Sequence, residues 1–383
     1  MKKFLIKFSY IVLPIYILML GLVAYVTLYI SPRADSDLGS LALIPFGVEY
    51  SQSLKKYELK DTLFIKVNHT EELRNIHVDV LTVGDSFSQQ GNIGYQNYMP
   101  GEGLTVANCR RSLYENPLQY ACNILDWGVV DSTNVDVLVV EVVERDFALR
   151  ISDFKESKVE VPEPESAPDG EKRNANEWSL LRARDFILYR FAGRSPVYVV
   201  DLDRDFFSSR EPNKLYFYDG DIKNGLTIDE AVVPKVKNVF DVLTRKAHER
   251  GIQLMLMVAV DKYDLYQDYI TDNPYPPKRV NEDIREIFGD IPEVMLCKYS
   301  LQPLVEKGEK DVFLFDNTHW SYKGSEAVGK ELSRRVIPLL SSCVPLVASD
   351  QRSSGRGARR VGWSDPPSNS QAADAFPSID KQR

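Results

Sequence analysis

The chain reads His77-Val78-Asp79-Val80-Leu81-Thr82-Val83-Gly84-Asp85-Ser86, an apolar run that stops at a glycine and two polar residues. Aliphatic and β-branched side chains in such a short run predict a buried strand. Gly84 permits a sharp turn after that strand. The turn would expose the Ser86 hydroxyl at the C-terminal edge of the strand, where α/β proteins bind their ligands. The stretch therefore predicts both a sheet and a nucleophile.

Similar apolar runs recur along the chain and alternate with helical patterns. The predicted strands are 76–83, 103–108, 135–143, 252–260 and 312–315. The predicted helices are about 115–126, 178–192, 229–250, 281–288 and 324–340. Alternation of strands and helices predicts an α/β fold, with a parallel sheet covered by helices on both faces in three layers.

The first residues of the chain predict a transmembrane helix. Residues 4–30 are almost wholly apolar and are long enough to cross roughly 30 Å of hydrocarbon at about 1.5 Å per residue. Lys2, Lys3 and Lys7 lie at the beginning of this stretch, whereas acidic residues follow Arg33. The positive-inside rule then places the N-terminus in the cytoplasm and the rest of the chain outside. A cleaved signal peptide is the alternative, but the stretch is longer than a signal core and lacks a small-residue cleavage site.

Composition divides the chain into three parts. Residues 1–32 are the predicted anchor and 33–347 a single catalytic domain with an insertion at about 151–228, while 348–383 are expected to be disordered because they hold few apolar residues. The acidic, proline-rich stretch 153–176 reads as a surface excursion. A net charge of −8 argues against a nucleic-acid partner, since phosphate binding needs a basic patch.

The four cysteines allow two interpretations. An exported domain could pair Cys109 with Cys122, which are the closest in sequence. Alternatively, these residues are buried thiols together with Cys297 and Cys343. No Cys-x-x-Cys or other metal-ligand spacing is present, so we expect no metal site and no cofactor.

A second informative stretch lies near the end of the chain, where Asp316-Asn317-Thr318-His319-Trp320 follows the apolar residues 312–315. A serine nucleophile commonly uses a histidine base whose tautomer is fixed by a third group. His319 has a carboxylate three residues before it, so we predict His319 as the base and Asp316 as the orienting acid. The remaining histidines lack this setting: they are His69, His77 and His248.

Charged residues also follow two other predicted strands. Glu141, Glu144 and Arg145 close the strand 135–143, and Lys262 and Tyr266 follow the strand 252–260. Side chains at the carboxyl ends of buried parallel strands point into the ligand-binding crevice. We expect them to support or contact a polar substrate, or else to form ion pairs that close the edge of the sheet.

The oxyanion of an acyl-transfer intermediate requires hydrogen-bond donors near the nucleophile. The backbone N–H of Ser86 is one candidate. The next predicted strand ends at Asn108, which is the second candidate, unless that residue merely turns the chain.

Taken together, these motifs resemble the SGNH/GDSL hydrolase superfamily, in which an early Gly-Asp-Ser segment is combined with a late Asp-x-x-His. Segments 141–145, 258–266 and 316–320 are similar to those of the SGNH-like proteins that O-acetylate alginate and related exopolysaccharides, so Trp320 joins the substrate-side candidates. In the alginate proteins the Asp-Thr-His-Trp segment precedes the serine segment, so this chain resembles a circular permutation of that arrangement. The superfamily's glycine and asparagine oxyanion donors are missing: residues 109–112 hold no glycine, and Glu144 stands where asparagine is expected.

The resemblance covers roughly residues 76–340 and implies an activity. It implies a Ser86–His319–Asp316 triad and an O-acyl, most simply acetyl, transferase or esterase acting on an exported or cell-envelope polysaccharide. The expected location is the bacterial inner membrane, with the catalytic domain in the periplasm. Because acetyl-CoA is absent there, a multispanning membrane protein is the expected acyl donor. The alternative is a catalytically silent subunit that binds polysaccharide or acts as a scaffold.

Overall fold

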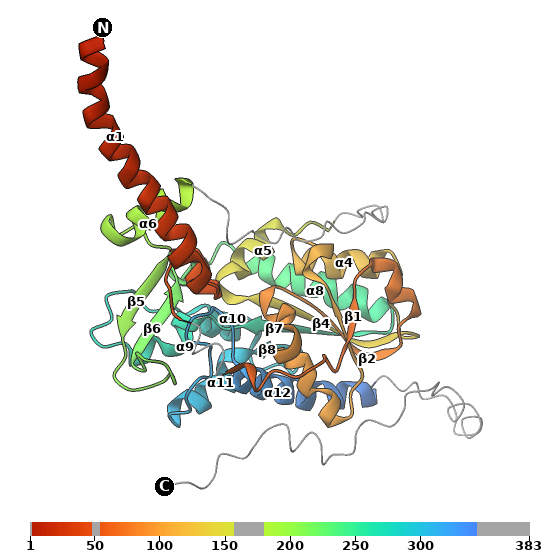
Figure 1. Cartoon of the computed structure of the whole chain (residues 1–383). Coiled ribbons are helices and arrows are strands. Elements are labelled where there is room, and N and C mark those ends of the chain that lie inside the picture. The colour runs from red at the N-terminus through yellow and green to blue at the C-terminus, as the bar shows by residue number, and fades with distance from the viewer. Residues whose placement is uncertain (1, 48–53, 157–179, 343–383) are drawn as a thin grey trace, which may run out of the picture.

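A computed structural model describes residues 2–47, 54–156 and 180–342 of the chain (Figure 1). Most of the predicted acidic excursion, Cys343 and the predicted disordered tail 348–383 lie outside the described residues. Within them the α/β prediction is confirmed. A parallel sheet carries helices on both of its faces, and one long helix projects from the globular part.

The main sheet has six strands in the order β1-β3-β2-β4-β7-β8, and every neighbouring pair is parallel. Its strands are β1 Ile65–Val67, β2 Val78–Gly84, β3 Val106–Cys109, β4 Val135–Val143, β7 Gln253–Ala259 and β8 Val294–Leu296. The central strands β2, β4 and β7 are almost continuously buried, as expected for parallel strands covered on both faces.

Helices form the two outer layers. One face of the sheet is covered by α4 Pro117–Asp126, α5 Phe147–Asp153, α8 Val233–Glu249 and α10 Val280–Phe288. The opposite face is covered by α11 Cys297–Glu306 and α12 Tyr322–Ser342. The short helices are α2 Asp37–Ala42, α7 Gly220–Lys223 and α9 Lys262–Tyr266. The predicted helices near 115–126, 229–250, 281–288 and 324–340 correspond to α4, α8, α10 and α12.

The strand order produces a topological switch point. From β2 the chain passes to β3 on one side and then returns to β4 on the other side of β2. Loops leaving the carboxyl ends of β2 and β4 therefore diverge, and ligands of open α/β sheets bind in the crevice between such loops. Residues that follow Gly84 and Val143 consequently lie at the expected binding edge.

Two strands of the main sheet were missed, and one strand was predicted wrongly. The segments that form β1 and β8 are only three residues long in the sheet, too short to show a periodic pattern. Residues 312–315 do not enter the sheet. Phe313 instead forms an isolated antiparallel bridge with Trp320, so this apolar segment is one side of a tight loop.

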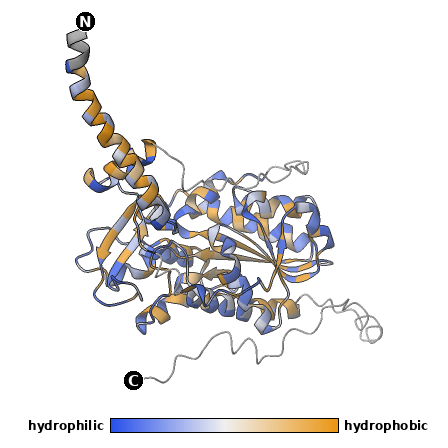
Figure 2. Ribbon diagram, viewed as in Figure 1, coloured by the Kyte–Doolittle hydropathy of each residue, from blue (hydrophilic) through white to orange (hydrophobic). Residues whose placement is uncertain are grey.

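The projecting helix α1 Lys2–Tyr25 continues through a π-helical turn, Val26–Ile30, and a 3₁₀ turn, Ser31–Arg33. Residues Lys7–Arg33 form one helical stretch that is long and apolar enough to cross a membrane. Figure 2 shows apolar residues along its length, and side chains such as Leu18 and Ile11 are exposed in this structure. By length and composition this helix fits a membrane anchor or a signal sequence.

Beyond α5 the chain forms a small extension beside the sheet. It contains α6 Leu180–Phe191 and an antiparallel pair, β5 Val197–Asp201 and β6 Lys214–Tyr218. Leu215 and Phe217 of β6 are buried in the same core as α11 and α12, and Val197 packs on α2. The segment predicted as an insertion is therefore packed onto the main domain through its hairpin.

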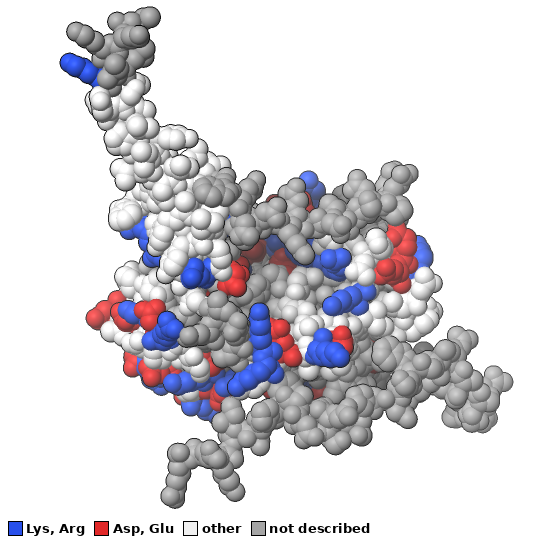
Figure 3. Space-filling model, in the orientation of Figure 1, with Lys and Arg blue, Asp and Glu red and all other residues white. Residues whose placement is uncertain are grey.

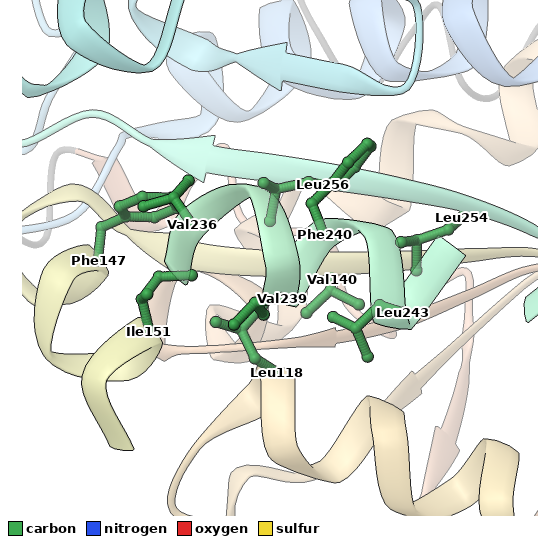
Figure 4. A pocket seen from close by; sticks show the side chains of 10 residues that line it. All are labelled: Leu118, Val140, Phe147, Ile151, Val236, Val239, Phe240, Leu243, Leu254 and Leu256. Atoms are coloured by element: carbon green, nitrogen blue, oxygen red, sulfur yellow. The ribbon is translucent and has the colours of Figure 1, made fainter. Parts of the chain in front are cut away.

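A small apolar cavity lies between α8 and the sheet (Figure 4), with a volume of about 10 Å³. Its lining is entirely hydrophobic: Leu118, Val140, Phe147, Ile151, Val236, Val239, Phe240, Leu243, Leu254 and Leu256. A space of this size holds at most about one water molecule and offers that water no polar partner. The cavity is a packing defect of the core and not a binding site.

The three described cysteines are free and buried: Cys109, Cys122 and Cys297. The suggested Cys109–Cys122 disulfide is therefore absent. Cys109 lies in β3 next to Tyr120, and the Cys122 thiol lies 3.8 Å from the Asp126 carboxylate, so the two sulfur atoms have separate surroundings. Burial raises the pKa of the Cys122 thiol to about 11, which leaves it protonated and unreactive at neutral pH.

Candidate functional site

Ser86 lies at the carboxyl edge of the sheet, as predicted. β2 ends at Gly84, Asp85 has an extended backbone, and Ser86 begins a 3₁₀ turn that runs to Gln89. Ser86 is half-buried, whereas Phe87 and Ser88 after it are fully buried. The backbone N–H of Ser86 opens the turn and so has no acceptor within it, which suits an oxyanion donor.

A buried carboxyl group holds this turn in place. Glu141 of β4 accepts hydrogen bonds from both the hydroxyl of Ser88, at 2.9 Å, and its backbone N–H, at 3.2 Å. Burial, and secondarily the nearby Asp85 carboxylate, raise the pKa of Glu141 to about 8. Glu141 thus lies beneath the serine turn and positions it, rather than pointing into the crevice.

Gly84 is needed for space and not for an unusual backbone angle. A Cβ atom at this position would lie 2.2 Å from Ser88 Oγ and 2.5 Å from Glu141 Oε2. The φ angle of Gly84 is not positive, so the sharp turn itself does not demand glycine. The glycine is required because the serine turn and the Glu141 side chain approach the strand end so closely.

We expect Gly84→Ala to lower the free energy of unfolding by about 1–3 kcal/mol, as overpacking of a tight core site does. Chemical denaturation measures this loss. Gly101 is a matched control, because a Cβ there meets nothing within 4 Å and its φ is not positive. Equal stability of the two alanine variants would contradict the close packing around Gly84.

Asp85 ties the serine turn to neighbouring elements. Its carboxylate lies 2.8 Å from Arg150 and 3.5 Å from Arg111, and it accepts from the backbone N–H of Val143 at 3.4 Å. Burial raises the pKa of Asp85, and the two guanidinium groups oppose that shift. The residue therefore fixes the strand end and is not itself presented to a ligand.

The imidazole of His319 is held by Asn317. Nδ1 lies 2.6 Å from Asn317 Oδ1, and the same oxygen accepts from the His319 backbone N–H at 3.1 Å. An amide oxygen only accepts, so this network assigns the proton to Nδ1 and leaves the lone pair on Nε2. Nε2 is shielded from solvent and makes no hydrogen bond within the described residues. This is the tautomer that a general base for serine requires.

The serine turn and the histidine loop are in direct contact. The Phe87 ring, next to Ser86, lies 4.9 Å from the imidazole of His319 and 4.4 Å from the ring of Trp320. Gln90 donates to the carbonyl of Trp320 at 2.7 Å. No hydrogen bond joins Ser86 to His319 Nε2 in the described part of the chain. Such bonds are often long in unliganded enzymes and tighten when substrate binds.

Asp316 does not take the predicted place beside the histidine. Its carboxyl group interacts with Ser36 and Lys262, and burial raises its pKa. Among the described residues, the carboxylate that pairs with Nδ1 is that of Asp37, at 3.8 Å. Asp37 also accepts a hydrogen bond from the hydroxyl of Thr318. The carboxylate near the imidazole thus comes from α2, shortly after the membrane-length helix.

Lys262 positions the histidine loop from below. Its ammonium group donates to the carbonyl oxygens of Leu314, Phe315 and Asn317, at 2.7, 2.8 and 3.2 Å. These bonds use all three donors of a lysine. Burial lowers the pKa of Lys262 to about 7. A fully buried and fully bonded side chain cannot contact substrate, so the predicted substrate role is replaced by a positioning role.

Glu144 and Arg145 belong to a buried ion network. Glu144 accepts from the backbone N–H of Asp261 at 2.8 Å. Arg145 lies 2.5 Å from Asp261 and 3.3 Å from Asp221. This corresponds to the alternative in which charges close the sheet edge. Arg145 nevertheless lies close enough to His319 for its charge to lower the pKa of that imidazole.

Three further candidates are structural. The amide of Asn108 is buried and donates to the carbonyl of Ser88 at 3.0 Å while accepting from Thr82, so it holds the serine turn instead of an oxyanion. Tyr266 and Trp320 are fully buried among aromatic rings. Neither side chain is exposed to solvent, so neither takes the predicted substrate-side position.

Comparison with known proteins adds no information about this site. No protein-family model, curated protein or solved structure matches the chain. The chemistry of the site is therefore argued from its own contacts, chiefly those of Phe87, Asn317 and His319.

Two functional residues were missed from the sequence. Asn317 lies inside a recognised motif, and an asparagine commonly accepts from the backbone N–H two residues later, so a local signal for it existed. Asp37 is separated from Thr318 by most of the chain and lies in a short segment after the predicted anchor. No sequence pattern links residues so far apart.

Proposed function

We propose that this protein is a membrane-anchored serine acyltransferase or esterase that acts on an exported or cell-envelope polysaccharide. Ser86 is the nucleophile and His319 the base. Asn317 orients the imidazole, in the role predicted for Asp316, with the Asp37 carboxylate behind it. The strand order β3-β2-β4-β7-β8 agrees with a flavodoxin-like doubly wound sheet and supports the SGNH resemblance.

One observation carries the proposal. The two motifs that resemble SGNH proteins lie far apart in sequence, yet Phe87 packs directly on His319 at the switch point of the sheet. The base also has the required tautomer, because Asn317 accepts at Nδ1 and Nε2 has no partner within the described chain. Ser86 is half-buried on the same turn as Phe87, and a serine hydroxyl that reaches such an imidazole is the arrangement that acyl transfer to and from oxygen uses.

The proposed reaction has two steps. Ser86 Oγ attacks the acyl carbonyl while His319 Nε2 takes its proton, and the donor oxygen leaves with that proton to give an acyl-serine. A sugar hydroxyl then attacks the acyl group, His319 takes the hydroxyl proton, and the proton returns to Ser86 Oγ. Water in place of the sugar gives hydrolysis.

The position of Asp37 supports a membrane source for the acyl group. Three residues separate Arg33, at the end of the membrane-length helix, from Asp37, so their Cα atoms lie at most about 14 Å apart even in extended chain. The histidine loop is therefore close to the point where the helix enters the domain. A multispanning membrane protein that delivers the acyl group would meet the site there.

Mass spectrometry of the intact full-length protein tests the proposal. After incubation with an activated acetyl ester, the peptide that contains Ser86 should carry an acetyl group, and a serine-reactive phosphonate should label the same residue. Addition of a polysaccharide acceptor should discharge the acetyl group onto sugar hydroxyls.

The scaffold alternative predicts a different outcome. It is favoured by the occluded Nε2 atom and by the lack of a bond between Ser86 and His319. Polysaccharide binding that persists in Ser86→Ala and His319→Ala, together with no acyl-serine in the parent protein, would establish the scaffold and reject the enzyme.

The pH dependence of kcat/KM should reveal the environment of His319. Burial, with Arg145 assisting and Asp37 opposing, lowers the pKa of His319 from 6.5 to about 4. The base is neutral above that value, so the rate should stay constant on acidification through pH 6 and fall only near pH 4. In Asp37→Asn, which removes the opposing charge, the fall should move to lower pH. A fall centred near 6.5 would show that a solvated histidine acts instead.

A further inference from the structure

Helix α6 packs beside the base of the projecting helix (Figure 1). The Phe186 ring lies 6.1 Å from the ring of Tyr25 and packs on the buried side chains of Val26 and Ile30. Ala183, one turn earlier, is also buried. One face of α6 is thus occupied by the end of the membrane-length helix.

The other face of α6 is apolar and exposed. Leu180, Ile187 and Phe191 are 63%, 40% and 81% exposed, and Leu181 beside them is 62% exposed. Spacings of seven and four residues place Leu180, Ile187 and Phe191 on one side of a helix. Arg184 lies between Leu180 and Ile187 on this side and pairs with Asp185. Exposed apolar side chains gathered on one side of a helix mark a contact with another apolar phase or partner.

The neighbouring aromatic residues indicate how deep these apolar side chains would lie in a membrane. Tyr25 and Tyr29 stack at the end of the apolar stretch, and the Arg33 guanidinium lies 4.1 Å from the centre of the Tyr29 ring. Tyrosine and arginine at the end of a transmembrane helix mark the boundary between hydrocarbon and headgroups. Because Phe186 contacts Tyr25, α6 lies at that same boundary.

The charge of α6 also suits a lipid surface. Residues 180–194 contain one acidic residue, Asp185, and four arginines: Arg182, Arg184, Arg190 and Arg194. Figure 3 shows basic side chains where the projecting helix joins the globular part. A helix that combines exposed apolar side chains with several arginines is typical of segments that lie in the plane of the membrane interface, because an arginine can extend its charged end to the headgroups.

We propose that α6 is an interfacial helix, which inserts Leu180, Ile187 and Phe191 into the lipid surface where α1 emerges. The proposal rests on α1 remaining as a membrane anchor, as in the proposed function. With two contacts to the bilayer, the domain cannot rotate freely about α1. The α2 segment, which follows Arg33 and carries Asp37, is then held close to the membrane surface.

Spin-label accessibility of the full-length protein in nanodiscs of mixed neutral and anionic phospholipids tests this proposal. A nitroxide is attached to Phe191→Cys in a background in which Cys343 is replaced by serine, since the other cysteines are buried. Leu18→Cys in α1 reports the hydrocarbon, and Ile337→Cys on α12, on the other side of the domain from α1 (Figure 1), reports water. The Phe191 label should collide with oxygen several-fold more, and with a water-soluble nickel chelate several-fold less, than the Ile337 label.

Three outcomes would overturn the inference. If the Phe191 label behaves like the Ile337 label while Leu18 remains in hydrocarbon, the anchor stands and the interfacial helix is rejected. Shielding of the Phe191 label from both reagents would show that protein, and not lipid, covers α6. If the Leu18 label is also in water, α1 is no anchor and both claims fall, whereas the acyl-serine experiment still decides the chemistry separately.

Discussion

Replacement of Ser86 by alanine is expected to lower kcat/KM for an activated acetyl ester by about 10³-fold or more, since removing the nucleophile of a serine enzyme leaves only residual catalysis. The expected loss follows from the position of Ser86 at the first residue of the turn, half-exposed and beside the ring that packs on His319. Rates of ester hydrolysis by the full-length protein in detergent measure it.

The stability of Ser86→Ala serves as an internal check. The side chain is half-exposed, so its truncation should leave the melting temperature within about 2 °C of the parent, as for surface substitutions. His248→Ala is a control, because His248 is exposed in the last turn of α8. A Ser86→Ala protein that retains more than a tenth of the parent rate would remove the serine from the mechanism.

Replacement of Asn317 by alanine should lower kcat/KM by about 10²–10⁴-fold. The amide oxygen of Asn317 is the acceptor that keeps the proton on Nδ1, and loss of the correct tautomer costs about 10⁴-fold in a serine protease triad. The effect should lie in kcat, since Asn317 is a positioning residue. Asn317→Asp keeps an acceptor oxygen and should recover activity to within about tenfold of the parent.

Asp316→Asn provides the discriminating comparison. The carboxyl group of Asp316 interacts with Ser36 and Lys262, away from the imidazole. We therefore expect its replacement to change kcat/KM far less than Asn317→Ala does. If Asp316→Asn proves the more damaging variant, the loop rearranges on substrate binding and the acid predicted from the Asp-x-x-His spacing is the functional one.

The sequence predicted the central part of the fold because long buried strands have a clear pattern. The runs that form β2, β4 and β7 are continuous and aliphatic, and the polar residues after them mark the binding edge. The segment 312–315 has the same apolar character and misled the prediction. Its residues are buried by packing of Phe313 and Phe315 in a loop, and burial alone does not distinguish a loop from a strand.

The structure brings the two candidate motifs together, but it changes the contacts that were predicted around them. Ser86 and His319 could be identified because few histidines exist and each motif follows an apolar run. The roles of Glu141 and Lys262 depend on which atoms they contact in the folded chain. A charged residue after a strand can either bind substrate or support a loop, and the sequence pattern is the same in both cases. Asp37 could not be foreseen, because its contact with Thr318 is created only by folding.

The contact between Thr318 and Asp37 has a consequence for where the protein can work. Proteolytic shedding of the domain by a cut between Asp37 and Leu43 would separate the histidine loop from its acid, even though the sheet would remain whole. Release of the domain from the membrane is therefore expected to lower the proposed acyl-transfer activity. Under the proposed function, a shed form is expected to be a poorer enzyme than the tethered one, because Asp37 follows closely on the proposed anchor.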